Sequence, residues 1–260
     1  MAEPFLDSHL HLQMEEFEFE KNMNVFTSSL RENNVRILNI VGYDVDSSKK
    51  SFSIEFPDDF EVYHFAGIHP HYASNYTDQD IHEIEKLLDE KGCSGIGEIG
   101  VDLFWHKKDE LKQQKELFIK QLDLARKKKK PVMLHVRNGY EEVFEIIDDY
   151  KDLVFEFHSF SGTEKNLKNL VSKGYFFGIN GIITFKNNDL KDIIKKDHIE
   201  RMLIETDSPY LSPVPFRGKR NRPEYVVYIY KKISELLNID IEDLKKIVKK
   251  NFYEFIGKKS

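Results

Sequence analysis

The chain has very little cysteine: Cys93 is its single thiol among 260 residues, so an internal disulfide bond is impossible. One unpaired cysteine is typical of proteins from a reducing compartment. The chain also has no apolar stretch long enough to cross a bilayer, and its N-terminus shows no basic segment followed by an apolar run. We therefore expect a soluble, cytoplasmic protein that does not act at a membrane.

An excess of positive charge is missing as well. The chain has 39 lysines and arginines against 45 aspartates and glutamates, which gives a formal net charge of −6 at pH 7. A chain with this balance has no general attraction for polyanions, so any binding of nucleic acid must use a local patch. The run RKKKK at residues 126–130 precedes a predicted strand, and cations suit the end of a helix. We interpret this run as a solvated helix end.

Glycine-rich phosphate loops are also absent. An open, doubly wound nucleotide-binding sheet would carry such a loop after its first strand. Here the corresponding segment, SHLHLQMEE from Ser8, contains no glycine, and the pattern GxxxxGK[ST] does not occur in the chain. These two absences argue against a nucleotide-binding fold of that kind.

What the chain does have is a regular alternation of short apolar segments with amphipathic ones, the pattern of repeated strand–helix units. Strands are expected to begin at Phe5, Val35, Val62, Cys93, Pro131, Leu153, Tyr175 and Arg201, and helices to cover residues 77–92, 166–174 and 241–259. Eight such units in about 250 residues are typical of a (β/α)8 TIM barrel. Because no linker interrupts the pattern, we expect an α/β fold with one domain over residues 1–260 and a closing C-terminal helix.

In such a barrel, chemically active side chains gather at the C-terminal ends of the strands. The predicted strands end in His9, His11, His69, His71, Glu98, His135, His158, Glu205 and Asp207. Side chains alternate along a strand, so Asp7, His9 and His11 share one face. Imidazoles and carboxylates are common ligands of divalent metals, and their convergence at one rim predicts a metal site.

Seven motifs that carry these residues resemble the TatD family of metal-dependent deoxyribonucleases, within the larger set of amidohydrolase-like barrels. They are DSHLHL from Asp7, GIHPH from Gly67, GEIGVD from Gly97, PVMLHVR from Pro131, HSFSG from His158, GIITFKN from Gly181 and ETDSPYLSPVPFRGKRNRP from Glu205. A lone HxH pair is a weak signal, but this ordered set spans nearly the whole chain and is specific.

The resemblance implies two divalent metal ions, either Mg, Mn or Zn. The first ion would bind His9, His11 and Asp207, the second would bind His135 and His158, and Glu98 would bridge them. The implied reaction is hydrolysis of DNA phosphodiesters by a metal-bound hydroxide, with Asp207 and Glu98 as catalytic residues. A recessed barrel mouth favours single strands or ends, so we expect an exonuclease whose partner is DNA.

Other residues are expected to support this site. Asp7 and Glu205 are candidates for holding the ligand histidines in place from behind. His69, Arg217 and Trp105 are candidates for substrate contacts: the first two for phosphate, and Trp105 for stacking on an unpaired base. We expect His71 to be structural.

Two alternatives to the deoxyribonuclease stay open. The same metals could hydrolyse another ester or a phosphomonoester, for example a misacylated tRNA. The chain could also be a non-enzymatic scaffold in a DNA repair or degradation complex, although a scaffold has no need for a complete set of metal ligands. A hydantoinase-like amide hydrolase is disfavoured, because Lys91 and Lys107 both lie outside the fourth predicted strand, where such enzymes carry a modified lysine.

Overall fold

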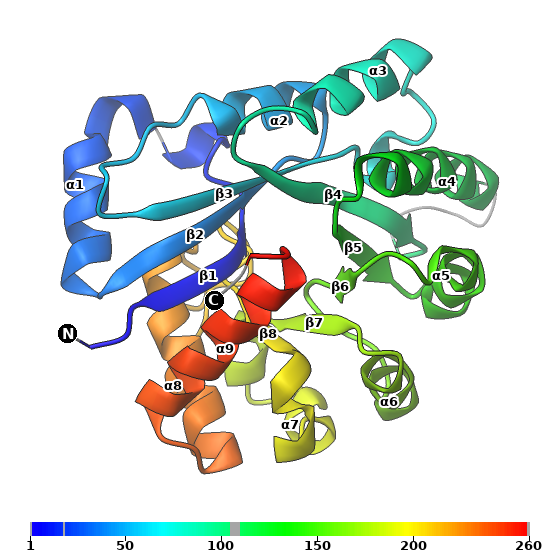
Figure 1. Cartoon of the computed structure of the whole chain (residues 1–260). Helices are drawn as coiled ribbons and strands as arrows, with labels where there is room; N and C mark the ends of the chain where they lie inside the picture. The colour runs from blue at the N-terminus through cyan, green and yellow to red at the C-terminus, as the bar shows by residue number, and fades with distance from the viewer. Residues whose placement is uncertain (1, 18, 105–109, 259–260) are drawn as a thin grey trace.

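The computed structural model describes residues 2–17, 19–104 and 110–258, and eight parallel strands form its centre (Figure 1). The strands are β1 (Phe5–Leu10), β2 (Val35–Val41), β3 (Glu61–Ala66), β4 (Cys93–Asp102), β5 (Val132–Arg137), β6 (Phe155–Phe157), β7 (Phe176–Ile179) and β8 (Met202–Ile204). Each strand pairs with the next one along the chain, so their spatial order is the sequence order. All eight expected strands are present.

Backbone hydrogen bonds bring the last strand back to the first. Beyond the end of β8, Asp207 N–H donates to His9 O (2.9 Å) and His11 N–H donates to Ser208 O (2.9 Å). A parallel bridge also joins Leu10 to Ser208. The predicted (β/α)8 barrel is therefore confirmed, and its closing seam passes directly through the HxH motif.

Helices form a ring outside the strands (Figure 1). The α-helices are α1 (Phe19–Glu32), α2 (Val45–Phe52), α3 (Asp78–Leu87), α4 (Leu111–Lys128), α5 (Tyr140–Ile147), α6 (Glu164–Ser172), α7 (Leu190–Ile193), α8 (Val226–Leu237) and α9 (Ile241–Phe255). Short 3-10 helices lie between them: η1 (Glu15–Phe17), η2 (Pro70–Tyr72), η4 (Asp148–Tyr150), η5 (Gly181–Thr184), η6 (Lys196–Arg201) and η7 (Pro223–Tyr225). None of the helices in the described ranges is long and apolar enough to cross a membrane.

Helix α9 closes the barrel at the end opposite the strand C-termini. It packs against β1 and β8, beside which it is drawn in red in Figure 1. The buried ring of Phe255 stacks on Phe65 of β3 at 5.7 Å and lies 5.8 Å from Phe176 of β7. One side chain thus joins strands from different parts of the barrel, as expected of a closing helix.

Local signals set where α3 begins, but its end differs from the expectation. Thr77 caps the helix as predicted: its hydroxyl accepts from Asp80 N–H, and the Asp80 carboxylate accepts from Thr77 N–H. The helix ends at Leu87, however, and not next to Gly92. Gly92 adopts a φ of +98°, which suits glycine, and turns the chain into β4.

The basic run 126–130 lies at the end of α4, where acidic side chains neutralise it. Arg126 pairs with Asp152 at 2.7 Å, and Lys127 pairs with Glu85 at 2.6 Å. The interpretation of this run as a helix end is confirmed.

Candidate metal centre

His9 in β1 and His11 directly after it point into the barrel, with their Nε2 atoms 3.1 Å apart. His11 Nδ1 lies 2.8 Å from the carbonyl oxygen of Val41. Because a carbonyl can only accept, Nδ1 carries the proton and His11 Nε2 presents a lone pair to the centre. His9 Nδ1 faces Met133 Sδ, which likewise leaves its Nε2 directed at the centre.

Glu98 of β4 lies at the middle of the cluster, and its two carboxylate oxygens face different imidazoles. Its Oε2 atom is 3.5 Å from both His9 Nε2 and His11 Nε2. Its Oε1 atom is 2.8 Å from His135 Nδ1, 3.0 Å from His158 Nε2 and 3.3 Å from His69 Nε2. A carboxylate placed between two sets of nitrogen donors has the arrangement that a bridging ligand needs.

Asp207 completes the first set from the loop after β8. Its Oδ1 atom lies 3.7 Å from His9 Nε2 and 3.5 Å from His11 Nε2. Four ligands about 2.1 Å from one ion in a tetrahedron are about 3.4 Å from one another. The separations of 3.1–3.7 Å found here match that spacing, so these residues fit a divalent metal ion.

The position of His69 differs from the expectation of a purely substrate-facing residue. It is buried, and with Glu98 and His135 it forms a group of three potential ligands whose donor atoms lie within 4.8 Å of one another. Burial lowers the pKa of His69 to about 3, so the imidazole is neutral. The geometry therefore places His69 beside His135 and Glu98, two of the residues expected to hold the second ion. Its neighbour His71 contacts Asp102 Oδ2 at 3.3 Å.

Glu205 and Asp7 both lie behind the candidate ligands, but they act on different atoms. Glu205 Oε1 is 3.6 Å from His158 Nδ1 and accepts from Ser159 N–H at 2.6 Å. Asp7 holds Thr206: its carboxylate accepts from Thr206 N–H (2.8 Å) and from the Thr206 hydroxyl (2.6 Å), with a longer contact to His9 N–H (3.4 Å). Asp7 thus orients the chain beside His9 and Asp207. It makes no contact with an imidazole nitrogen of the described residues.

Asp102 is a supporting residue that the sequence reasoning missed. Its Oδ2 atom lies 3.0 Å from His135 Nε2, on the opposite side of the ring from Glu98. Gln114 fixes Asp102 in turn, because the amide of Gln114 bonds to both the N–H and the carbonyl of Asp102. The available signal was spacing: Asp102 is four residues after Glu98 in one strand, so both side chains share a face.

The buried carboxylates of this centre remain ionised because imidazoles surround them. Burial raises the pKa of Glu98, but the positive charge of His158 and the contact with His135 hold it well below its usual range. Burial also raises the pKa of Asp207, but the nearby imidazoles of His11, His9 and His158 outweigh burial and lower this pKa below its usual value. The centre therefore offers anionic oxygens to a cation.

A cavity of about 640 Å³ opens above this centre, at the C-terminal ends of the strands. It is lined by His11, His69, Glu98, His135, His158 and Asp207, together with residues from the surrounding loops. Among the described residues that line it, Arg137 is the one with a permanent positive charge. Arg137 was not expected as a substrate contact, although it lies two residues after His135 in the motif PVMLHVR.

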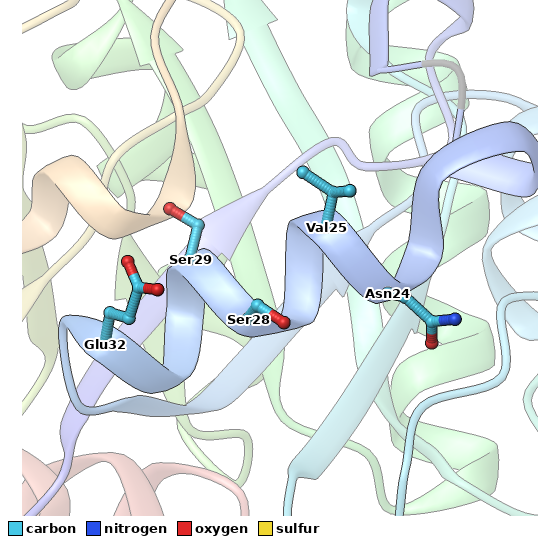
Figure 2. Close-up of a pocket in the computed structure, with 5 residues that line it drawn as sticks. All are labelled: Asn24, Val25, Ser28, Ser29 and Glu32. Carbon is cyan, nitrogen blue, oxygen red and sulfur yellow. The ribbon is translucent and has the colours of Figure 1, made fainter.

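One expected substrate contact, Arg217, is not among the described residues that line the cavity. The guanidinium of Arg217 stacks 3.6 Å from the ring centroid of Phe185. Trp105 lies outside the described residues. A second hollow, of about 380 Å³, lies along α1 (Figure 2). Among the described residues that line it, Glu32 carries the one carboxylate and none carries an imidazole. It has no ligand set comparable to that of the barrel mouth.

Comparisons with known proteins agree with this geometry. The chain matches the family model described as TatD related DNase over residues 6–257. It is 32% identical over 248 residues to an uncharacterized metal-dependent hydrolase of Bacillus subtilis, covering 94% of this chain and 96% of that protein. A second such hydrolase, from Mycoplasma genitalium, is 34% identical over 263 residues, covering 95% of this chain and 97% of the relative.

Solved structures show the same fold. A TatD homolog from Escherichia coli K12, YjjV, superposes with a TM-score of 0.89 at 23% identity and covers 98% of both chains. A TatD family hydrolase from Entamoeba histolytica superposes with a TM-score of 0.85 at 20% identity, also over 98% of both chains.

Proposed function

The chain belongs to the TatD related DNase family of metal-dependent hydrolases, and from this premise we propose that it hydrolyses DNA phosphodiesters as an exonuclease on single strands or ends. The observation that carries the proposal is Glu98, whose two oxygens face two separate sets of imidazoles. We treat residues 1–260 as one domain, since the family match spans nearly all of them.

The proposed metal ligands divide into two sets. His9, His11 and Asp207 would hold one divalent ion, His135 and His158 the other, and Glu98 would contact both. His69 lies near enough to join the second set. When bound, such ions activate a water molecule and neutralise the phosphoryl oxygens, whether the ion is Mg, Mn or Zn.

The residues of the chain then have defined tasks. Asp207 is ionised and lines the cavity, so its carboxylate can accept the proton of the attacking water. Arg137 presents a guanidinium to the same cavity and can hold a phosphate oxygen. Asp102 holds the ring of His135, and Glu205 fixes the backbone at Ser159, directly after His158. Arg217 and Trp105 stay candidates for contacts farther along the strand.

The depth of the centre supports a preference for unpaired DNA. Glu98 is only 4% exposed, and it lies at the floor of the cavity. A phosphate must enter the barrel mouth to reach it, which a single strand or a frayed end achieves more readily than the middle of a duplex.

The test is digestion of end-labelled single-stranded and blunt duplex DNA after chelation of the protein, with Mg, Mn or Zn added back. We expect stepwise shortening that requires metal and is lost in Glu98→Gln and Asp207→Asn. Glu32→Gln, an exposed carboxylate of α1, is the matched control and should retain activity. Intact DNA under every metal, with metal bound, would contradict the proposal and redirect it to other esters or phosphomonoesters.

A further inference from the structure

Exposed aromatic side chains concentrate at the barrel mouth. Among the side chains that the structure describes, three large aromatic ones are more than a third exposed: Tyr72 (37%), Phe104 (53%) and Tyr210 (50%). Tyr72 and Tyr210 line the cavity, and Phe104 lies under Arg137, its ring centroid 3.8 Å from the guanidinium carbon. Exposed apolar side chains that gather in one place are typical of ligand-binding surfaces, so this placement points to a ligand.

Two of these rings belong to a group of three tyrosines on one side of the mouth. Tyr43 follows β2, Tyr72 ends η2 and Tyr210 lies in the loop after β8, and all three line the cavity. The rings of Tyr43 and Tyr72 are nearly parallel, with an interplanar angle of 10° and centroids 6.4 Å apart. We name Tyr43, Tyr72 and Tyr210 the tyrosine wall.

The tyrosine wall adjoins the metal centre through His11. The ring of His11 packs edge-on against Tyr43 at 5.6 Å and against Tyr210 at 6.3 Å. Its Nε2 atom is also 3.5 Å from Asp207 Oδ1. A phosphate held at the centre would therefore have its neighbouring sugar and base beside the wall.

Arg137 and the tyrosine wall lie on opposite sides of the mouth. In a barrel whose eight strands follow sequence order, β1 and β5 face each other across the axis. Arg137 ends β5, whereas the tyrosine wall surrounds His11, which directly follows β1. A nucleotide combines an anionic phosphate with a flat aromatic base, and this division of the mouth matches both parts.

We propose that the tyrosine wall stacks an unpaired nucleobase next to the phosphate held at the metal centre, and that this stacking selects single-stranded over duplex nucleic acid. The inference rests on the proposed function for the identity of the phosphate ligand. Base stacking on aromatic side chains tolerates any base, so the wall confers selection for strandedness and not for sequence.

The test is direct binding, which does not require catalysis. A fluorescent thymidine decanucleotide and the same oligonucleotide with abasic sites are titrated onto chelated protein, with anisotropy as the readout. We expect the wild type to bind the base-bearing strand more tightly, and Tyr72→Ala and Tyr210→Ala to weaken that binding about tenfold. Binding of the abasic strand should not change. Tyr72→Phe and Tyr210→Phe should keep the preference, because the ring is retained.

Tyr63→Ala, at the start of β3, replaces a tyrosine away from the cavity and should bind both oligonucleotides like the wild type. Equal binding of the two strands by the wild type, or equal weakening for both strands in the alanine variants, would overturn the tyrosine wall. If the base preference holds but no DNA is cut in any metal, the proposed nuclease function fails while the tyrosine wall stands.

Discussion

At the scale of single residues, the site depends on groups that would be unstable alone in a barrel interior. Asp102 is fully buried, and burial of an unpaired carboxylate is expensive. It is tolerated because His135 Nε2 and Phe104 N–H both lie within hydrogen-bonding distance of its oxygens. In return, Asp102 fixes which nitrogen of His135 faces Glu98.

We predict that Asp102→Asn weakens metal binding without unfolding the protein. The amide retains the shape but removes the charge that orients and polarises His135, and loss of such a partner typically costs 10- to 100-fold in metal affinity. Competition against a chelator of known affinity measures the change. Asp59→Asn, at an exposed carboxylate, is the control. Unchanged affinity in Asp102→Asn would show that His135 does not depend on Asp102.

His64 provides a pH-dependent prediction away from the metal centre. Its ring stacks on Phe52 at 4.8 Å, and within the described residues its buried Nδ1 atom has no hydrogen-bond partner. Burial lowers the pKa of His64 to about 4, below the usual 6.5. Between these two values the unfolded chain takes up a proton that the folded chain refuses. The folded state therefore loses stability as the pH falls from 6.5 to 4.

The variant His64→Phe should remove this loss while keeping the stack on Phe52. We expect its free energy of unfolding, relative to the wild type, to rise by up to about 3 kcal/mol as the pH falls from 6.5 to 4. Urea denaturation in the presence of chelator, at several pH values, measures the difference. If the difference in free energy of unfolding between the variant and the wild type stays constant from pH 6.5 to 4, the pKa of His64 is not lowered by burial.

The residue scale also shows where sequence reasoning stops. Strand alternation and position were enough to bring His9, His11 and Glu98 together. They could not show which of Arg137 and Arg217 reaches the cavity, because both lie near strand ends at the same rim. The chain turns after Asp207 so that Arg217 packs on Phe185, whereas Arg137 ends β5 and lines the cavity. That choice depends on loop packing, for which the sequence has no periodic signal.

At the scale of elements, the seam between β1 and β8 sets the geometry of His9, His11 and Asp207, the proposed ligands of the first ion. Strand β8 has only three residues, and beyond it the chain is tied to β1 by backbone bonds at His9 and His11. The Asp7 carboxylate adds two bonds to Thr206, the residue before Asp207. The positions of His9, His11 and Asp207 are therefore set together.

We predict that Asp7→Ala destabilises the seam. It leaves the buried Thr206 N–H without its acceptor, and an unsatisfied buried donor costs about 1–3 kcal/mol in the free energy of unfolding. Metal affinity should fall as well, because Asp207 loses its support. Denaturation and metal titration of the same samples check both effects, and Asp7→Asn, which keeps one acceptor oxygen, should lose less. Wild-type stability in Asp7→Ala would refute this role.

Element boundaries were less predictable than the elements themselves. Alternating apolar patterns indicated all eight strands, yet β6 and β8 are shorter than the apolar segments that contain them. The chain after each of them bends to place His158 or Asp207 at the mouth. Ser159 and Asp207 adopt positive φ values, 47° and 55°, which ends the strand pattern there. No propensity of these residues forecasts such bends, which are set by tertiary contacts.

At the scale of the whole molecule, the barrel makes one centre from residues more than 190 positions apart in the chain, such as His9 and Asp207. Closure by sequence order ensures that the C-terminal ends of all strands meet at one rim. The acidic net charge does not oppose the proposed binding of DNA, because Arg137 provides a positive charge at the cavity. The fold was predictable because it follows from a repeated sequence pattern. The residues that line the cavity were not all predictable, because they depend on how the loops pack.

The most direct test of the central claim is to count divalent ions bound per chain. The wild type and Glu98→Gln are dialysed against Mn or Zn and analysed by elemental mass spectrometry. A bridging Glu98 predicts about two ions per wild-type chain and a marked loss from both sets in Glu98→Gln, with the variant still folded. Two ions retained in Glu98→Gln, or none bound by the wild type, would contradict the account.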